Sequence, residues 1–244
     1  MKWPILIASC ALLAGCVASG GSKLVGAGND LRVADAAMAS GLPQTALSVT
    51  RDILQADPRN VRALLKQGDA LLAMGQADAA VECYRRAVAV DPRSAGGLRG
   101  LGRSLLASGD VREAEAMFRR ASEAAPDDAA SLNDLGIALD LQEKHDDAQA
   151  QYHAALARQP AMTAAQVNLG LSLALGGAAD RALAILRPLA VDPDADSRVR
   201  GNLAVALAMA GDQQAARNLL ATDMPQDRIE VALAGYAALR MPAK

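Results

Sequence analysis

Aromatic side chains are scarce in this sequence of 244 residues, which has one Trp, one Phe and three Tyr. Small residues, above all alanine, are abundant instead. A chain of this composition packs its helices closely through small side chains and does not assemble a large aromatic core. Its length suffices for one extended domain or two compact ones.

A strong net charge is also missing. The 27 acidic residues nearly balance the 25 basic residues, and the net charge at pH 7 is −2. No long-range electric field therefore attracts nucleic acid, and the sequence contains no RNA- or DNA-binding motif. We expect no nucleic-acid partner.

Metal-binding patterns are absent from the sequence as well. Cys10, Cys16 and Cys83 form no CxxC pair and no disulfide framework. The only histidines, His145 and His153, belong to no HExxH motif and have no cysteine partners. We expect no metal ion, and we interpret Cys83 as an inert packing residue on a helix.

Catalytic patterns are equally hard to find, since there is no GxSxG motif. The glycine-rich segment 96–102 resembles a phosphate-binding loop, but no strand precedes it and it has no Walker lysine. The acidic pairs Asp127–Asp128 and Asp146–Asp147 stand at expected helix starts, where negative charge is favourable. We therefore expect no enzyme activity, no cofactor and no small-molecule substrate.

What the sequence does contain is a repeated unit, most clearly seen at residues 61–93. Apolar and small residues recur there at steps of three and four, which is the period of two amphipathic helices. Gly75 marks the break between the helices, and Pro92 ends the second helix because proline has no N–H. The recurring positions hold Leu64, Gly68, Leu71, Ala80, Tyr84 and Ala87.

Copies of this unit follow at intervals of 34 residues. The equivalent positions hold Leu98, Gly102, Leu105, Ala114, Phe118 and Ala121, and then Leu132, Gly136, Leu139, Ala148, Tyr152 and Ala155. The prolines are spaced in the same way, at Pro58, Pro92, Pro126 and Pro160. The pattern resembles the tetratricopeptide repeat, whose unit has 34 residues. The resemblance implies an all-α fold, a right-handed superhelical solenoid of about six helical hairpins.

The recurrence of glycine at residues 68, 102 and 136 needs an energetic reason. Glycine in a helix interior costs about 1 kcal/mol compared with alanine. Three glycines at one position of the repeat imply a compensating gain, most simply a close approach of two helices.

The repeat frame also gives the domain organisation. The first repeat is degenerate, because Asp30 and Thr50 stand where the unit has large apolar residues, as expected at an end that faces solvent. Pro193 is displaced by one residue from the repeat frame, so we expect a bend before the sixth repeat. We predict repeats at 27–60, 61–94, 95–128, 129–162, 163–196 and 197–224, and a C-terminal capping helix within 225–244.

The first residues form a separate segment. One early lysine, Lys2, precedes a short apolar run that is too short for a permanent membrane span. The run ends in Leu13-Ala14-Gly15-Cys16, which resembles the lipobox of a bacterial lipoprotein. An ordinary signal peptide that ends in cysteine is the alternative.

The lipobox resemblance implies removal of residues 1–15 and attachment of lipid to Cys16. Lipoproteins of this type carry more than one acyl chain, and two chains suffice for stable anchoring. Asp at the next position would suggest retention in the inner membrane, so Val17 favours the outer membrane. We expect residues 16–26 to be a flexible tether, the lipid to be the only contact with the membrane, and the repeats to face the periplasm.

In the family that the repeats resemble, the first helices line a concave groove that holds peptides or partner helices. The frame places a mainly basic stripe in repeats one to three: Arg32, Asp35, Arg62, Lys66, Asp69, Arg99 and Arg103. In repeats four to six it places a mainly apolar stripe: Asn133, Ile137, Leu141, Val167, Asn168, Leu171, Leu175, Asn202, Val205 and Met209. The lysine and asparagine clamp that some members use to bind a C-terminal carboxylate is not reproduced.

Each stripe has a second interpretation. The charges can be an ordinary solvated face. The apolar half needs a cover, which can be an amphipathic helix of a partner, a second copy of the chain, or the chain's own last helix with Ile229, Leu233 and Tyr236 turned inward.

Two functions of different classes fit these features. The signal, lipobox, tether and repeats resemble the pilus-assembly lipoproteins of the Tad/Flp system (TadD-like) and of type IV pili (PilF/PilW-like). That resemblance implies an outer-membrane-anchored scaffold that binds a protein partner, such as a secretin or another pilus-assembly subunit, and helps to localise or assemble it. The alternative is a periplasmic peptide-binding chaperone or an accessory factor for assembly of envelope enzymes. The lipobox favours the scaffold, because a soluble chaperone needs no anchor.

Replacement of Cys16 by Ser is expected to leave an unlipidated precursor, because the serine hydroxyl cannot take the place of the thiol that carries the lipid. Cell fractionation and the intact mass of the mature protein measure the effect. A wild-type protein that lacks residues 1–15 but carries no lipid would contradict the assignment of Cys16 as the anchor.

Overall fold

The structure is a computed structural model, and it describes residues 27–191 and 195–239. This part of the chain contains helices and no strands, so the predicted all-α solenoid is confirmed. The predicted signal, tether and lipid site at Cys16 lie outside the described residues. The helices are α1 (Ala27–Ala39), α2 (Pro43–Ala56), α3 (Val61–Ala73), α4 (Ala77–Val90), α5 (Ala95–Ser108), α6 (Val111–Ala124), α7 (Ala129–Asp140), α8 (His145–Arg158), α9 (Thr163–Leu175), α10 (Ala179–Ala190), α11 (Ser197–Met209), α12 (Gln213–Leu220) and α13 (Gln226–Leu239).

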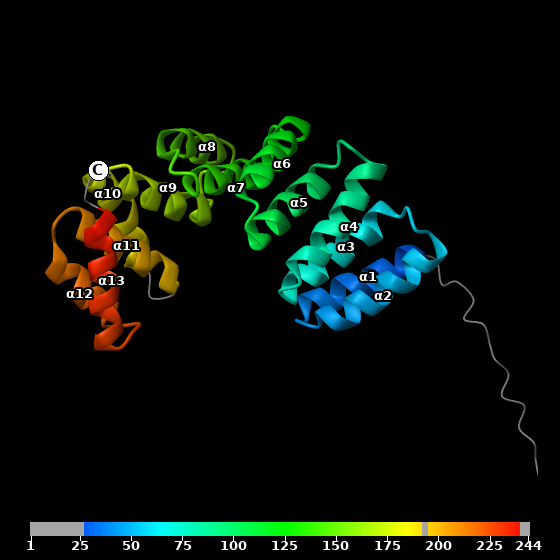
Figure 1. The fold of residues 1–244 in the computed structure, drawn as a ribbon, viewed down its shortest axis with the longest axis horizontal. Helices are drawn as coiled ribbons and strands as arrows, with labels where there is room; N and C mark the ends of the chain where they lie inside the picture. Colours follow the sequence, from blue (N-terminus) through cyan, green and yellow to red (C-terminus); the bar gives the residue numbers. More distant parts are fainter. Residues whose placement is uncertain (1–26, 192–194, 240–244) are drawn as a thin grey trace, which may run out of the picture.

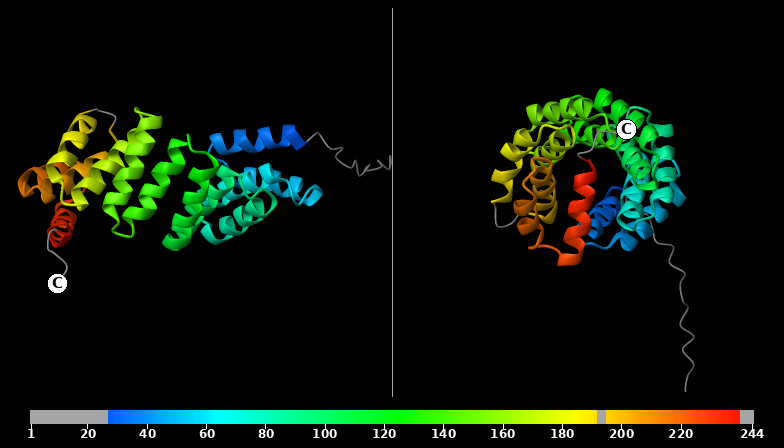
Figure 2. Two further views of the ribbon diagram at one scale, coloured as in Figure 1. Left: turned by 90° about the horizontal axis from the view of Figure 1, so that it is seen from above. Right: turned by 60° about the vertical axis from the view of Figure 1, so that its left-hand side comes forward.

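The first twelve helices form six antiparallel hairpins that stack side by side in chain order (Figure 1). Each helix packs against its neighbours in sequence, and the first helices of successive hairpins also contact one another. Seen from one end, the hairpins curve around an open centre (Figure 2, right). The inner side of a curved stack is shorter than its outer side, so helices on the inner side lie closer together. Because the first helices of successive hairpins contact one another, they lie on this inner side and face the centre. They therefore form its concave face.

Within a hairpin, a glycine of the first helix lies against a large side chain of the second. A Cβ atom on Gly68 would lie 2.6 Å from the ring of Tyr84, closer than real Cβ atoms come to their neighbours. The same arrangement recurs at 2.5 Å between Gly102 and Phe118, Gly136 and Tyr152, and Gly170 and Leu186. The predicted close approach is confirmed. Only a residue without a side chain leaves room for these buried groups.

The first hairpin uses a smaller pair at the same place. Ala34 replaces the glycine, and Thr50 replaces the aromatic residue; both are fully buried. The Thr50 hydroxyl donates a hydrogen bond of 2.8 Å to the carbonyl of Ala46 in its own helix. This bond satisfies a polar group that would otherwise be costly to bury.

A left-handed residue ends the first helix of every hairpin. Five of the six are glycines with φ between +69° and +94°, and the sixth is Glu143 with a φ of 61°. The next residue donates its N–H back to the last full turn of the helix, as in the 2.9 Å bond from Gln76 to Leu71. Glu143 keeps the turn although its side chain makes this conformation unfavourable.

Arginines join neighbouring repeats on the outside of the stack. Arg86 donates to the carbonyl of Pro58 at 3.1 Å, and Arg120 donates to the carbonyl of Pro92 at 3.3 Å. Arg158 makes the equivalent bond to Pro126, at 3.2 Å, from a position four residues later in its repeat. Each guanidinium thus gives a hydrogen-bond partner to a carbonyl in the loop between two repeats.

The C-terminal end departs from the regular repeat. The helix α12 has only 8 residues, and α13 follows it and packs against α11 and α12. Ile229 and Leu233 of α13 are buried. Figure 2 shows α13 in red inside the curve of the hairpins. None of the helices in the described part is long and apolar enough to cross a membrane.

Gly136→Leu is expected to destabilise the protein by about 3 kcal/mol or more, because the new side chain must displace the buried ring of Tyr152. Gly41→Ala is expected to cost about 1 kcal/mol, because Gly41 has a φ of +69° but open space around it. Thermal or urea unfolding followed by circular dichroism measures both effects.

Gly201→Ala is the matched control. Gly201 lies within α11, and no atom lies within 4 Å of the place that a Cβ atom would take there. Alanine at this position is therefore expected to be neutral or stabilising by up to about 1 kcal/mol. Equal losses for Gly136→Leu and Gly41→Ala would contradict the packing described above.

Candidate functional site

The predicted groove residues from Arg62 to Met209 belong to the first helices of hairpins two to six or directly follow them, and Arg32 and Asp35 of the predicted stripe belong to α1. Arg62 and Lys66 are on α3, and Arg99 and Arg103 are on α5. The remaining residues are Asn133 and Ile137 on α7, Leu141 at its end, Val167, Asn168, Leu171 and Leu175 on α9, and Asn202, Val205 and Met209 on α11.

Ion pairs join some of the first helices across the charged part of this face. Lys66 of α3 lies 2.5 Å from Asp35 of α1. Arg99 of α5 lies 3.2 Å from Asp128 and 3.8 Å from Asp134, at the start of α7 and within it. Within the described residues, neither Arg62 nor Arg103 forms an ion pair or a hydrogen bond. Two guanidinium groups of this face are therefore available to a ligand.

Burial and neighbouring charges shift the pKa values of Tyr84 and Asp134 in the charged part of the concave face. Burial and the carboxylate of Asp69 raise the pKa of Tyr84, whose hydroxyl donates to Asp69 at 2.6 Å. Burial raises the pKa of Asp134, and the charges of Arg99 and Arg103 offset part of the rise. Tyr84 is therefore a neutral hydrogen-bond donor that holds Asp69 against the second helix.

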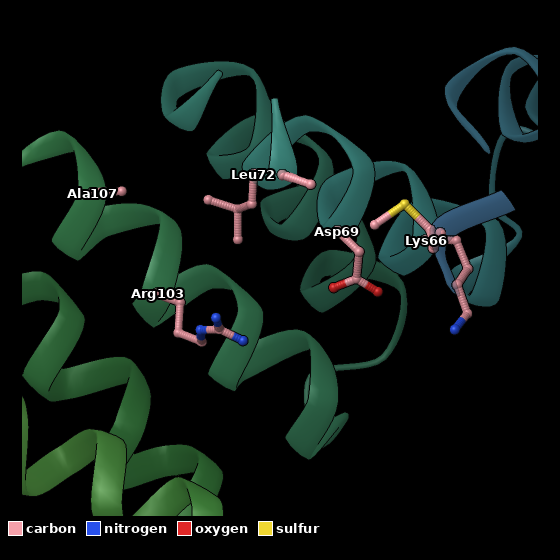
Figure 3. A pocket seen from close by; sticks show the side chains of 7 residues that line it. Lys66, Asp69, Leu72, Arg103 and Ala107 are labelled. Carbon is pink, nitrogen blue, oxygen red and sulfur yellow. The ribbon is translucent and has the colours of Figure 1, made fainter. Parts of the chain in front are cut away.

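Two adjoining pockets open between α3 and α5. One has a volume of about 490 Å³ and the other about 370 Å³, and both are lined by Lys66 and Asp69. Figure 3 shows Lys66, Asp69 and Leu72 on α3, and Arg103 and Ala107 on α5. We call the two pockets together the charged trough. Its other lining residues are Asp35, Met38, Arg62, Leu65, Ala73, Tyr84, Gly96 and Arg99.

The apolar part of the face has a pocket of its own. The helix α9 has no charged residue, and a pocket of about 410 Å³ lies between it and the start of α11. We call it the apolar pocket. It is lined by Val167, Leu171 and Val199, by Ala164, by the polar Thr163, Asn168 and Asn202, and by Asp196 and Arg198. Leu141, on the preceding repeat, is 59% exposed.

The asparagines of this part bind to their neighbours. Asn168 donates to the side-chain oxygen of Asn133 at 2.9 Å, and Asn202 donates to the carbonyl of Val167 at 3.4 Å. Asn133 is only 5% exposed and Val205 only 8%. Asn133 and Val205 are thus packing residues between first helices, whereas Leu171 and Asn168 line the apolar pocket. The repeat frame alone did not separate the two groups.

The last helix does not close the apolar pocket. Its contacts are with α11 and α12, where it buries Ile229 and Leu233, and Tyr236 is half-buried. The residues that line the apolar pocket come from α9 and from the start of α11. The last helix therefore takes the place of one more first helix at the end of the stack.

The comparisons with known proteins agree with this architecture. A sequence profile described as tetratricopeptide repeat matches residues 31–95, 65–129, 99–148 and 133–198, and a second profile of the same description matches 197–222. The chain belongs to the tetratricopeptide repeat (TPR) family. None of the curated proteins matches its sequence.

Solved structures with the same fold include several TPR proteins. PilW, a type IV pilus biogenesis factor, has a TM-score of 0.72 and 22% identity, with 80% of this chain and 91% of PilW covered. PilF of Pseudomonas aeruginosa has a TM-score of 0.69 and 17% identity, with 87% and 96% covered. MamA has a TM-score of 0.56 and 26% identity, with 63% and 90% covered. TPR proteins are in general protein-interaction scaffolds, and this chain is one of them.

One polar cluster of this TPR domain was not foreseen. The carboxylate of Asp140 accepts hydrogen bonds from Tyr152 at 2.8 Å and from Ser172 at 2.7 Å, and His145 Nδ1 lies 2.8 Å from it. The cluster joins the fourth hairpin to α9. Its signal in the sequence is weak, because the four residues are spread over 33 positions and share no motif.

The Asp140 cluster does not have the geometry of a serine hydrolase. In a Ser-His-Asp triad the histidine stands between serine and aspartate and takes the serine proton. Here Ser172 donates directly to Asp140, and its side chain is fully buried. The arrangement ties helices together and leaves no activated nucleophile. The described residues also contain no group of three or more His, Cys, Asp or Glu that could hold a metal ion.

Leu171→Glu is expected to lower the stability of the protein by about 1 kcal/mol or less, because Leu171 lines the apolar pocket and the new carboxylate can reach water. Leu173→Glu, two residues away in the same helix, is the matched control. Leu173 is 1% exposed, and burying a charge there is expected to cost about 4 kcal/mol or more. Thermal unfolding compares the two, and an equal loss would mean that Leu171 is covered.

Proposed function

We propose that this TPR protein is an outer-membrane-anchored scaffold that binds a subunit of a pilus or secretion system, in the manner of a pilotin for a secretin. The single observation that carries the proposal is the apolar pocket on the concave face. The lipid anchor and the partner's identity belong to the proposal, and each has its own support.

The apolar pocket offers a partner apolar contacts at Ala164, which is exposed, and at Leu171, which is half-buried. Val167, Leu171 and Val199 line it, and the chain's last helix packs elsewhere. Apolar side chains that reach the surface of a pocket commonly mark an interaction site. An amphipathic helix or a short apolar tail of a partner can place its apolar side chains there, while Asn168 and Asn202 orient its polar groups.

The anchor is proposed from the sequence. The string Leu13-Ala14-Gly15-Cys16 follows a short apolar run and resembles a lipobox. Lipid on Cys16, with Val17 as the next residue, favours the outer membrane. A tether of residues 16–26 would hold the concave face in the periplasm near the membrane in which a secretin assembles.

The comparisons support a role in pilus assembly. PilW is a type IV pilus biogenesis factor and shares this fold over 80% of the present chain. PilF shares it over 87%. At identities of 22% and 17% these likenesses concern the fold, so the role in pilus or secretion-system assembly is carried over as part of the proposal. A periplasmic chaperone without a lipid anchor is the alternative.

Deletion of the gene is expected to lower the amount of multimeric secretin in the outer membrane of the organism that makes this chain. The wild-type gene should restore the multimer, whereas Leu171→Glu and Cys16→Ser should not, since one loses the apolar contact and the other the anchor. Membrane fractionation followed by detection of the secretin multimer measures the effect, and Ala150→Glu on the outer face of α8 is the control.

The outcomes separate the parts of the proposal. Unchanged secretin multimers after deletion would refute the pilotin role. Full activity of Leu171→Glu would refute the apolar pocket as the binding site. Full activity of Cys16→Ser, together with a soluble periplasmic protein, would favour the chaperone.

A further inference from the structure

We infer that the charged trough binds an acidic segment of the partner protein, in extended conformation, that carries acidic and aliphatic side chains. This inference rests on the proposed function, because it concerns a second part of the same concave face. It assigns to the partner a chemistry that the apolar pocket does not require.

The charge of the trough carries the first step. Arg62, Lys66, Arg99 and Arg103 line it, against only two acidic residues, Asp35 and Asp69. Lys66 and Arg99 are neutralised by ion pairs to neighbouring first helices. Arg62 and Arg103 have no such pair within the part of the chain that the structure describes. A ligand that supplies negative charge at two separate points would form an ion pair with each of these arginines.

The position of the two free arginines gives the second step. Arg62 stands near the start of α3, and Arg103 projects from α5 beside Asp69, on the other side of the trough (Figure 3). Ion pairs connect α1 with α3 and α5 with α7. Among the described residues, no ion pair connects α3 with α5. The trough lies at this junction, with one unpaired guanidinium at its start, from Arg62, and one near its middle, from Arg103.

The uncharged lining distinguishes a peptide from other anions. Met38, Leu65 and Leu72 lie between the charges, and Asp69 stands in the middle. A lipid headgroup or a polyphosphate would place negative charge against Asp69 and leave the aliphatic groups uncovered. A peptide can instead present an N–H to Asp69, whose carboxylate has acceptor sites beyond the one that Tyr84 occupies.

The length of the trough fixes the size of the segment. Its lining runs along α3 from Arg62 to Ala73, which is about 17 Å at a rise of about 1.5 Å per residue. An extended peptide advances about 3.3 Å per residue, so about five residues fill the trough. Side chains of an extended peptide alternate in direction, so its side chains can reach both walls, α3 with Arg62, Leu65 and Leu72 and α5 with Arg103.

Gly96 keeps one end of the trough open. It lines the trough at the start of α5, and a Cβ atom there would lie 3.9 Å from Leu65, an ordinary contact. A larger side chain at this position is therefore compatible with the fold but would fill the space that the segment needs. This allows a steric test that leaves the charges unchanged.

The test selects binders for the full chain, purified in detergent, from a phage-displayed library of random short peptides. Affinities of the selected peptides are then measured by fluorescence anisotropy. We expect enrichment of Asp and Glu together with aliphatic residues. The double variant Arg62→Gln/Arg103→Gln and the single variant Gly96→Gln should each weaken these peptides by about tenfold or more, and added salt should weaken them as well.

Arg51→Gln/Arg112→Gln is the matched control. Both arginines are exposed on second helices, α2 and α6, and neither forms an ion pair or hydrogen bond with a described residue. This double variant changes the net charge by the same amount as Arg62→Gln/Arg103→Gln. It should leave the affinity for the selected peptides unchanged. Unfolding curves confirm that every variant is folded.

Three results would overturn the inference. Selected peptides that are apolar, and that lose affinity in Leu171→Glu but not in Arg62→Gln/Arg103→Gln, would refute the trough and leave the proposed function standing. Binding of phosphatidylglycerol vesicles without binding of acidic peptides would assign the trough to lipid. Equal losses in Arg62→Gln/Arg103→Gln and in the control would reduce the effect to net charge.

Discussion

The packing of a large buried side chain against a glycine is the contact on which the rest of this protein depends. In four consecutive hairpins the second helix places Tyr84, Phe118, Tyr152 or Leu186 where the first helix has no side chain. The space left by glycine is the space that the large side chain fills, so the helices of a hairpin approach closely with few aromatic residues in the chain. Because one side of each first helix is committed to this contact, the opposite side faces the concave surface and is free to vary. Stability and recognition therefore use different residues of the same helix.

Contacts between hairpins are more varied than those within them. Arginines reach the proline carbonyl of the preceding repeat on the outside, at Pro58, Pro92 and Pro126. Ion pairs join first helices in the N-terminal half of the concave face, whereas asparagine amides join them in the C-terminal half. The concave face is consequently divided in chemistry: charged groups border the trough between α3 and α5, and aliphatic groups border the apolar pocket between α9 and α11. A partner that spans both must change in character along its length.

Much of the fold and some of the candidate site could be predicted, and particular residues show why. Gly136 and Tyr152 recur at fixed positions of the repeat, so their contact follows from the frame. Glu143 holds a left-handed turn where the other hairpins have glycine, and its conformation is imposed by the helices on either side. Asn133 lies in the predicted groove stripe, yet its side chain is buried and accepts a hydrogen bond from Asn168 of the next first helix. Whether a residue on the inner side of a helix faces solvent or its neighbour depends on how far each hairpin is rotated against the next, and spacing does not encode that angle.

The sequence by itself determined the repeat, its length, the helix pairs and the all-α class, because these follow from local periodicity and from glycine and proline at fixed intervals. It also determined which helices carry the basic and the apolar residues. Only the tertiary structure decided which of these cations are paired: Lys66 and Arg99 meet carboxylates 31 and 29 positions away, whereas Arg62 and Arg103 form no ion pair with any of the described residues. It likewise decided that the last helix packs on α11 and α12 and leaves the apolar pocket open. Both outcomes depend on distances between side chains of different repeats, which the accumulated curvature of the stack sets and no single repeat contains.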